Sequence, residues 1–216
     1  MRKGLTEMVF ILDRSGSMGG LEKDTIGGYN SMLERQKKDG GEILVSTVLF
    51  DNEQEVLCDR VPIDRINPMT DKEYYVRGCT ALLDAVGGAI HHIGNVHKYA
   101  RDEDIPEKTI FVITTDGMEN ASRRYTYNKV KSMIRNEEEK YGWEFLFLGA
   151  NIDVAKESKR LGIREDRAVR YVNDSAGIEL NFQTVGAAVS KIRLSEEDLG
   201  SEWKAEIEND YRKRGK

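Results

Sequence analysis

The chain has 216 residues, of which 39% are hydrophobic and 33% charged, and its formal net charge is −5. This length and composition are typical of a globular chain with one substantial core, and they exclude a disordered or fibrous protein. The acidic balance argues against a protein that coats nucleic acid or an anionic membrane surface. We therefore expect neither nucleic acid nor membrane among its partners.

The opening residues predict no export signal. After a basic start, the apolar run "MVFIL" ends at Asp13. This run is too short for the hydrophobic segment of a signal peptide or for a membrane helix. The chain contains two cysteines, Cys58 and Cys79, too few for a disulfide scaffold, and we expect both as reduced thiols. Together these features predict a cytoplasmic protein.

In the first part of the chain, the strand "EMVFILD" is followed by a predicted helix over 21–38, where apolar residues recur at helical spacing. The next strand, "EILVSTVLFD", is separated from 55–61 by only a few polar residues, too few for a crossover helix. We therefore predict that 55–61 turns back as a short antiparallel edge strand. A long irregular connection follows, and connections of this length inside compact domains are often functional.

Further along, helices and strands alternate. A second amphipathic helix is predicted over 81–100, followed by "KTIFVITTD", a helix over 128–140, "WEFLFLGA", a helix over 152–161, the weaker strand "RAVRYV" and a helix over 175–193. Continuous apolar runs are typical of parallel strands covered on both faces, and the alternation predicts a doubly wound α/β sheet. We assign 1–194 to this domain and 195–216 to a charged C-terminal helix or tail.

Three polar clusters are expected at the carboxyl edge of this sheet, where open α/β sheets bind ligands. Asp13, Ser15 and Ser17 follow the first strand, Thr80 ends the long connection, and Asp116 follows "KTIFVITT". Side chains two positions apart in an extended segment point the same way, so the first three converge on one point. A set of oxygen donors suits a hard cation such as Mg²⁺, with Mn²⁺ or Ca²⁺ as substitutes, whereas histidine and thiolate favour zinc or copper.

Simpler roles exist for each of these residues. Thr80 could cap the following helix, Ser15 or Ser17 could cap the helix over 21–38, and Asp116 with its glycine is a common turn pair. These roles do not explain why all three clusters come together at one edge. Two carboxylates at most balance a divalent ion, and hydroxyls add no charge. We therefore expect the metal to recruit an external anion, a carboxylate from Asp or Glu of a partner protein.

The stretches "VFILDRSGSM", "GCTALLDAV" and "FVITTDGMENAS" resemble, in order and spacing, the three motifs of the von Willebrand factor A (vWA) domain. The resemblance extends over roughly 6–190. It implies a Rossmann-like, mostly parallel six-stranded sheet with one short antiparallel edge strand and helices on both faces. It also implies a metal-ion-dependent adhesion site whose ligands, by motif position, are Asp13, Ser15, Ser17, Thr80 and Asp116. The chain looks most similar to stand-alone intracellular bacterial members, which implies an ATPase or a stress-response component as a candidate partner.

These observations predict a metal-dependent protein-binding module rather than an enzyme. The alternative is a magnesium- or manganese-dependent hydrolase of the phosphoesterase type, but no base or nucleophile is evident near the predicted ligands. A third hypothesis is an oligomerisation domain with a vestigial site. Two neighbouring features stay open. Asp84 and Glu119 are candidates for supporting the ligands or capping a helix, and Glu119 is the one more readily explained as merely solvated. Tyr74, Tyr75 and Arg77 either rim the site, or the two tyrosines pack under the long connection.

Overall fold

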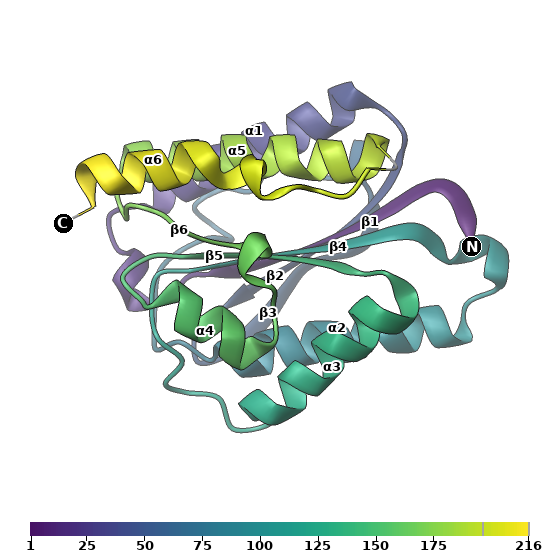
Figure 1. The fold of residues 1–216 in the computed structure, drawn as a ribbon, viewed down its shortest axis with the longest axis horizontal. Helices are drawn as coiled ribbons and strands as arrows, with labels where there is room; N and C mark the ends of the chain where they lie inside the picture. Colours follow the sequence, from purple (N-terminus) through teal and green to yellow (C-terminus); the bar gives the residue numbers. More distant parts are fainter. Residues whose placement is uncertain (196, 216) are drawn as a thin grey trace.

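The computed structural model describes residues 1–195 and 197–215. Six strands form one sheet in the order β3-β2-β1-β4-β5-β6 (Figure 1). They are β1 (Arg2–Asp13), β2 (Glu42–Phe50), β3 (Gln54–Pro62), β4 (Pro106–Thr115), β5 (Glu144–Gly149) and β6 (Ala168–Arg170). All neighbouring pairs are parallel except β2 and β3, which are antiparallel. The predicted fold class is confirmed, although the edge strand β3 is one residue longer at each end than predicted.

Helices cover both faces of the sheet (Figure 1). One face carries α1 (Glu22–Asp39), α5 (Ser175–Leu194) and α6 (Ala205–Arg214), and the other carries α2 (Leu82–Tyr99), α3 (Tyr127–Tyr141) and α4 (Val154–Leu161). Within residues 1–195 and 197–215, no helix combines the length and apolar character that a bilayer crossing needs.

Each face of the sheet has its own hydrophobic core. Phe10 and Leu12 of β1 pack in the cluster that includes α1 and α5, whereas Val9 and Ile11 pack in the cluster that includes α2 and α3. Successive side chains of a strand point to opposite faces, so a central strand covered on both sides must be apolar throughout. This requirement explains the unbroken apolar run that ends at Asp13.

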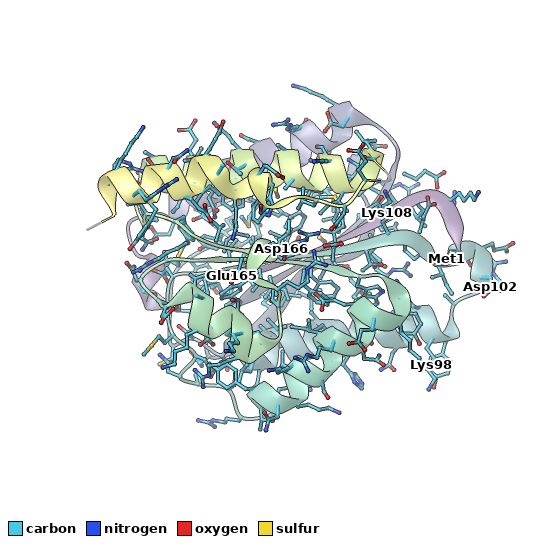
Figure 2. The ribbon with its side chains drawn as sticks, in the orientation of Figure 1. Met1, Lys98, Asp102, Lys108, Glu165 and Asp166 are labelled. Carbon is cyan, nitrogen blue, oxygen red and sulfur yellow. The ribbon has the colours of Figure 1, made fainter. Side chains whose placement is uncertain are left out.

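The residues after α5 form a 3-10 turn (Ser201–Lys204) and α6, which contact α5 and β6. They hold the turn at Glu165 and Asp166 (labelled in Figure 2), which precedes β6. The indole N–H of Trp203 donates to the carbonyl oxygen of Asp166 at 2.8 Å, and Lys204 Nζ donates to that of Glu165 at 2.7 Å. Ile207 of α6 is buried in the core cluster of this face. The C-terminal segment therefore covers the edge of the sheet at β6.

The strand order places a topological switch point between β1 and β4. From β1 the chain first moves to β2 and β3 on one side, and it later returns to β4 on the other side. Crevices at such points, beyond the carboxyl ends of the strands, are where open α/β sheets bind ligands. Asp13 is the last residue of β1, and Asp116 directly follows β4. The fold therefore brings two of the predicted ligands to the edges of one crevice.

Candidate metal centre

The turn after β1 presents the first three predicted ligands. Asp13 and Ser15 are buried, whereas Ser17 is exposed. The backbone N–H of Ser15 donates to Asp13 Oδ1 at 2.7 Å, and that of Met18 donates to the Ser15 carbonyl oxygen at 3.0 Å. These bonds fold the chain into a short 3-10 turn over Gly16–Met18. The aspartate is thus held at the floor of the site, while the second serine faces solvent.

Hydroxyl and carboxylate oxygens from three segments meet above this turn. Ser15 Oγ lies 3.1 Å from Ser17 Oγ and 3.2 Å from Thr80 Oγ1, and Ser17 Oγ donates to Asp116 Oδ1 at 2.5 Å. The Asp13 carboxylate lies beside this cluster, because its Oδ1 accepts from the backbone N–H of Ser15. The structure therefore brings together all five side chains that the sequence predicts as ligands.

Thr80 is positioned by backbone contacts on both of its sides. Its N–H donates to Asn120 Oδ1 at 2.9 Å, and the N–H of Ala81 donates to the Asp51 carbonyl oxygen at 2.7 Å. The N-cap of α2 is Ala81, and the Thr80 hydroxyl donates to Ser15 instead of capping the helix. A Cβ on Gly117 would lie 3.0 Å from Thr80 Oγ1, so glycine lets the segment after β4 pass close to the site.

Two acidic side chains dock the loop after β4 onto the start of α2. The carboxylate of Glu119 accepts from the N–H of Leu83 at 2.9 Å, which satisfies an amide at the helix N-terminus. In return, Asp84 accepts from the three consecutive amides of 123–125. The prediction that Asp84 and Glu119 support the ligands or cap a helix is confirmed for both, and the alternative that Glu119 is merely solvated is wrong. The signal for its role is its position just after a strand end and near a helix N-terminus, which attracts negative charge.

The long connection before Thr80 wraps around the end of β1. Tyr74 is buried and its hydroxyl donates to the Asp13 carbonyl oxygen at 2.5 Å. Tyr75 is partly exposed, and its ring lies over the guanidinium groups of Arg14 and Arg77. Tyr74 therefore packs beneath the connection, whereas Tyr75 and Arg77 lie at its surface beside the turn that follows β1.

Two contacts at the site were not predicted. Thr115 Oγ1 donates to Asp13 Oδ2 at 2.6 Å, and Asn173 Nδ2, from the segment between β6 and α5, donates to Asp116 Oδ2 at 3.0 Å. Each carboxylate therefore has a neutral donor on the oxygen that is not bonded to a serine. These donors orient the two carboxylates without neutralising them.

Burial dominates the electrostatics of the site. Asp13 and Asp116 are each 1% exposed. Burial raises the pKa of Asp13 to about 6, although hydrogen bonds from Thr115 and Ser15 lower it and the nearby Asp116 raises it. Burial also raises the pKa of Asp116, against hydrogen bonds from Ser17 and Asn173. Among the residues that the structure describes, neither carboxylate forms an ion pair, which is an unfavourable arrangement unless a cation joins it.

The donor set fits a small hard cation. Around a metal with Mg–O distances of about 2.1 Å, neighbouring oxygens of an octahedron are about 3.0 Å apart. The Ser15 oxygen lies 3.1 and 3.2 Å from the oxygens of Ser17 and Thr80. In the described part of the chain, no three His, Cys, Asp or Glu side chains cluster as a metal site. Hydroxyls and two carboxylates would therefore have to do the binding, and such oxygen ligands favour hard cations.

Comparison with known proteins supports the fold. No protein-family model and no curated protein sequence matches the chain. Among solved structures, proximal thread matrix protein 1 from the mussel byssus, with a zinc-occupied MIDAS motif, is 16% identical with a TM-score of 0.59. The alignment covers 87% of this chain and 46% of that one. A von Willebrand factor type A protein from Catenulispora acidiphila is also 16% identical, with a TM-score of 0.59 and coverages of 87% and 43%.

A third similar structure is the vWF domain of the type V pili tip protein Mfa5 from Porphyromonas gingivalis. It is 12% identical with a TM-score of 0.62, and the alignment covers 89% of this chain and 97% of that domain. This chain therefore spans less than half of the first two proteins but matches nearly all of the isolated domain. At such identities the likeness shows the fold alone. The sheet order and these three matches together establish that the chain has the von Willebrand factor A fold.

Proposed function

We propose that this chain is a divalent-cation-dependent protein-binding module with Mg²⁺ as its cation. Asp13 and Asp116 would supply the negative charge, and the hydroxyls of Ser15, Ser17 and Thr80 would complete the protein's share of the ligands. The main support for this proposal is a pair of buried carboxylates that have no cationic partner among the described residues. They lie in a cluster with hydroxyls whose oxygen–oxygen distances suit an octahedral ion.

The charge balance indicates what kind of partner the site would recognise. When bound, the cation supplies a positive charge that can accept an oxygen ligand from outside. Two carboxylates can at most neutralise a divalent ion, and the three hydroxyls add no charge, so an anionic oxygen is the favoured external ligand. Ser17 is exposed, which leaves the cluster open to solvent on that side. The proposed partner is therefore a protein that presents an Asp or Glu carboxylate.

The hydrolase alternative has no specific observation in its favour. A general base has to reach the reacting atoms, and histidine is the most common one. The side chain of His92 contacts Asp59, and that of His97 contacts Glu7, far from the predicted ligands along α2. A cytoplasmic location is a proposal that rests on the sequence pattern and the resemblance, and an ATPase or stress-response component as partner is a proposal that rests on the resemblance alone.

The proposal is tested by metal-dependent capture. Immobilised protein should retain a partner in Mg²⁺ and release it in EDTA, and Thr80→Ala should lose this capture because it removes one ligand oxygen. Thr80→Ser is the matched control, since it keeps the hydroxyl and should keep capture. Circular dichroism checks that both variants fold. Once a partner is identified, replacing one of its carboxylates by the amide should abolish binding. Capture that persists in EDTA would refute the proposal.

A further inference from the structure

Arg14 lies between two predicted ligands, but its side chain points away from them. The alternation that directs Asp13 and Ser15 into the site directs Arg14 to the opposite side. The residue is 0% exposed. Burying a guanidinium is unfavourable unless it is well paired. Its partners therefore indicate what this residue does.

Those partners form a compact group that we name the Arg14 cluster, made of Arg14, Asp51, Glu55, Tyr75 and Arg77. Arg14 Nη1 forms an ion pair with the half-exposed carboxylate of Glu55 in β3 at 2.7 Å. Arg14 Nε donates to Asp51 Oδ2 at 2.9 Å, and Arg77 Nε donates to the same oxygen at 2.7 Å. Burial alone would raise the pKa of Asp51, but the bonds from Arg77, the Glu53 amide and Arg14 together lower it. The ring of Tyr75 lies 5.4 Å from the Arg14 guanidinium and 5.6 Å from that of Arg77.

The Arg14 cluster is joined to the backbone on both sides of the site. The N–H of Arg77 donates to the Arg14 carbonyl oxygen at 2.9 Å, which ties the long connection to the end of β1. The carbonyl oxygen of Asp51 accepts from the N–H of Ala81 at 2.7 Å, which fixes the residue next to Thr80. Asp51 therefore links, through its side chain and its backbone, the two segments that carry Ser15 and Thr80.

The path between Arg77 and Thr80 leaves little room for adjustment. Gly78 has a φ of +66°, and a Cβ there would lie 1.9 Å from Asn52 Oδ1. Its carbonyl oxygen accepts from the N–H of Gly16, in the turn that follows β1, at 3.3 Å. A change in how Arg77 is held is therefore expected to move Thr80 relative to the serines.

We propose that Arg14 is a positioning residue that, through Asp51 and Arg77, sets the 3.2 Å spacing between the Ser15 and Thr80 oxygens and so the size of the cation the site accepts. The inference rests on the proposed metal site. Mg²⁺ requires near-ideal octahedral geometry at about 2.0–2.1 Å, whereas Ca²⁺ accepts flexible geometry at about 2.3–2.6 Å. Loosening the Arg14 cluster should therefore weaken Mg²⁺ binding more than Ca²⁺ binding.

Calorimetric titration of Arg14→Met with MgCl₂ and with CaCl₂ tests this selectivity. We expect the Mg²⁺ affinity to fall at least about tenfold, which is the typical effect of removing a residue that hydrogen-bonds to a metal ligand. The ratio of Mg²⁺ to Ca²⁺ affinity should fall as well. Arg167→Met is the matched control. Arg167 is also buried and paired, with Glu144 and Asp198, but it precedes β6. It should lower stability and leave the ratio unchanged. An unchanged ratio in Arg14→Met would overturn the proposal.

A second variant guards against misfolding. The Arg77 side chain is 40% exposed, so Arg77→Gln should disturb the protein interior less than Arg14→Met does. It should also lower the ratio of Mg²⁺ to Ca²⁺ affinity. Arg14→Lys, which retains a charge for Asp51, should recover part of the Mg²⁺ affinity.

A metal-independent measurement separates this proposal from the function above. In EDTA, the Ala81 amide should exchange with deuterium faster in Arg14→Met and Arg77→Gln than in wild type, but not in Arg167→Met. If wild type binds neither cation, the proposed function fails while this measurement still decides the positioning role. Unchanged exchange at Ala81 in both variants would show that the Arg14 cluster does not hold Thr80.

Discussion

Glu138 of α3 is a partly buried carboxylate with no role at the predicted metal site. Burial raises its pKa from 4.5 to about 7; Arg164 opposes the shift and Glu144 adds to it. Because the folded pKa lies above the unfolded one, the folded state binds the proton more tightly between these values. Proton binding to Glu138 therefore stabilises the folded state relative to high pH. This stabilisation is fully present below pH 4.5 and is lost as the pH rises through about 7.

The variant Glu138→Gln removes this titration. We expect the variant to be more stable than wild type by about 1–2 kcal/mol at pH 8 and to have no such advantage at pH 4.5, after discounting for the partial exposure of the group. Urea unfolding in EDTA at the two pH values measures the difference. Glu139→Gln, at the neighbouring exposed position, serves as the control and should show no pH-dependent gain. An equal effect of Glu138→Gln at both pH values would contradict the assigned pKa.

At the scale of elements, α6 is the segment whose contribution is least visible in the sequence. It is rich in charge, yet Ile207 is 1% exposed and belongs to the core cluster of the face that carries α1 and α5. Ile207→Ala should therefore lower the free energy of unfolding by about 2–4 kcal/mol. Lys213→Ala, at an exposed position of the same helix, should change it by less than about 0.5 kcal/mol. Chemical denaturation compares the two. Equal, small effects would mean that α6 is not part of the cooperative unit.

The regular elements were largely predictable because their periodicity is strong. The helix predicted over 175–193 is α5 at Ser175–Leu194, and the one predicted over 81–100 is α2 at Leu82–Tyr99. Strand limits were less predictable. β1 begins at Arg2 rather than at Glu7, because pairing with its neighbours extends it through 2–6, where Leu5 is the one large apolar side chain and no apolar pattern shows. Tertiary pairing, rather than local composition, sets that boundary.

The convergence of the five predicted side chains could be inferred because parallel strands end at one edge and alternate residues share a side. The contacts that other residues make with these five side chains could not be inferred. Asn173 lies far along the chain from Asp116, and no spacing rule joins them. Alternation places Arg14 on the side away from the site, but it does not reveal that Asp51 meets it there. Such contacts depend on how loops pack after the sheet has formed.

At the scale of the whole molecule, the predicted metal centre joins segments that are distant in the chain. Asp13 ends β1, Thr80 precedes α2, Asp116 follows β4, and Asn173 holds Asp116 from the segment before α5. A ligand bound to the folded state alone stabilises the whole cooperative unit. Because these segments separate on unfolding, a bound cation should stabilise the entire domain rather than one loop.

Thermal unfolding with and without the metal measures this effect. At a Mg²⁺ concentration of about one hundred times Kd, binding adds about 2.7 kcal/mol, which corresponds to a rise in Tm of about 5–10 °C for a domain of this size. Asp13→Asn keeps the shape and one oxygen but removes a charge, so its Tm should be insensitive to Mg²⁺. In EDTA at pH 8 the same variant should melt no lower than wild type, because it removes a buried, ionised carboxylate that forms no ion pair with the described residues. A wild-type Tm that is the same in Mg²⁺ and in EDTA would show that these side chains hold no ion. If the Tm of Asp13→Asn rises with Mg²⁺ as much as that of wild type, the ion binds elsewhere.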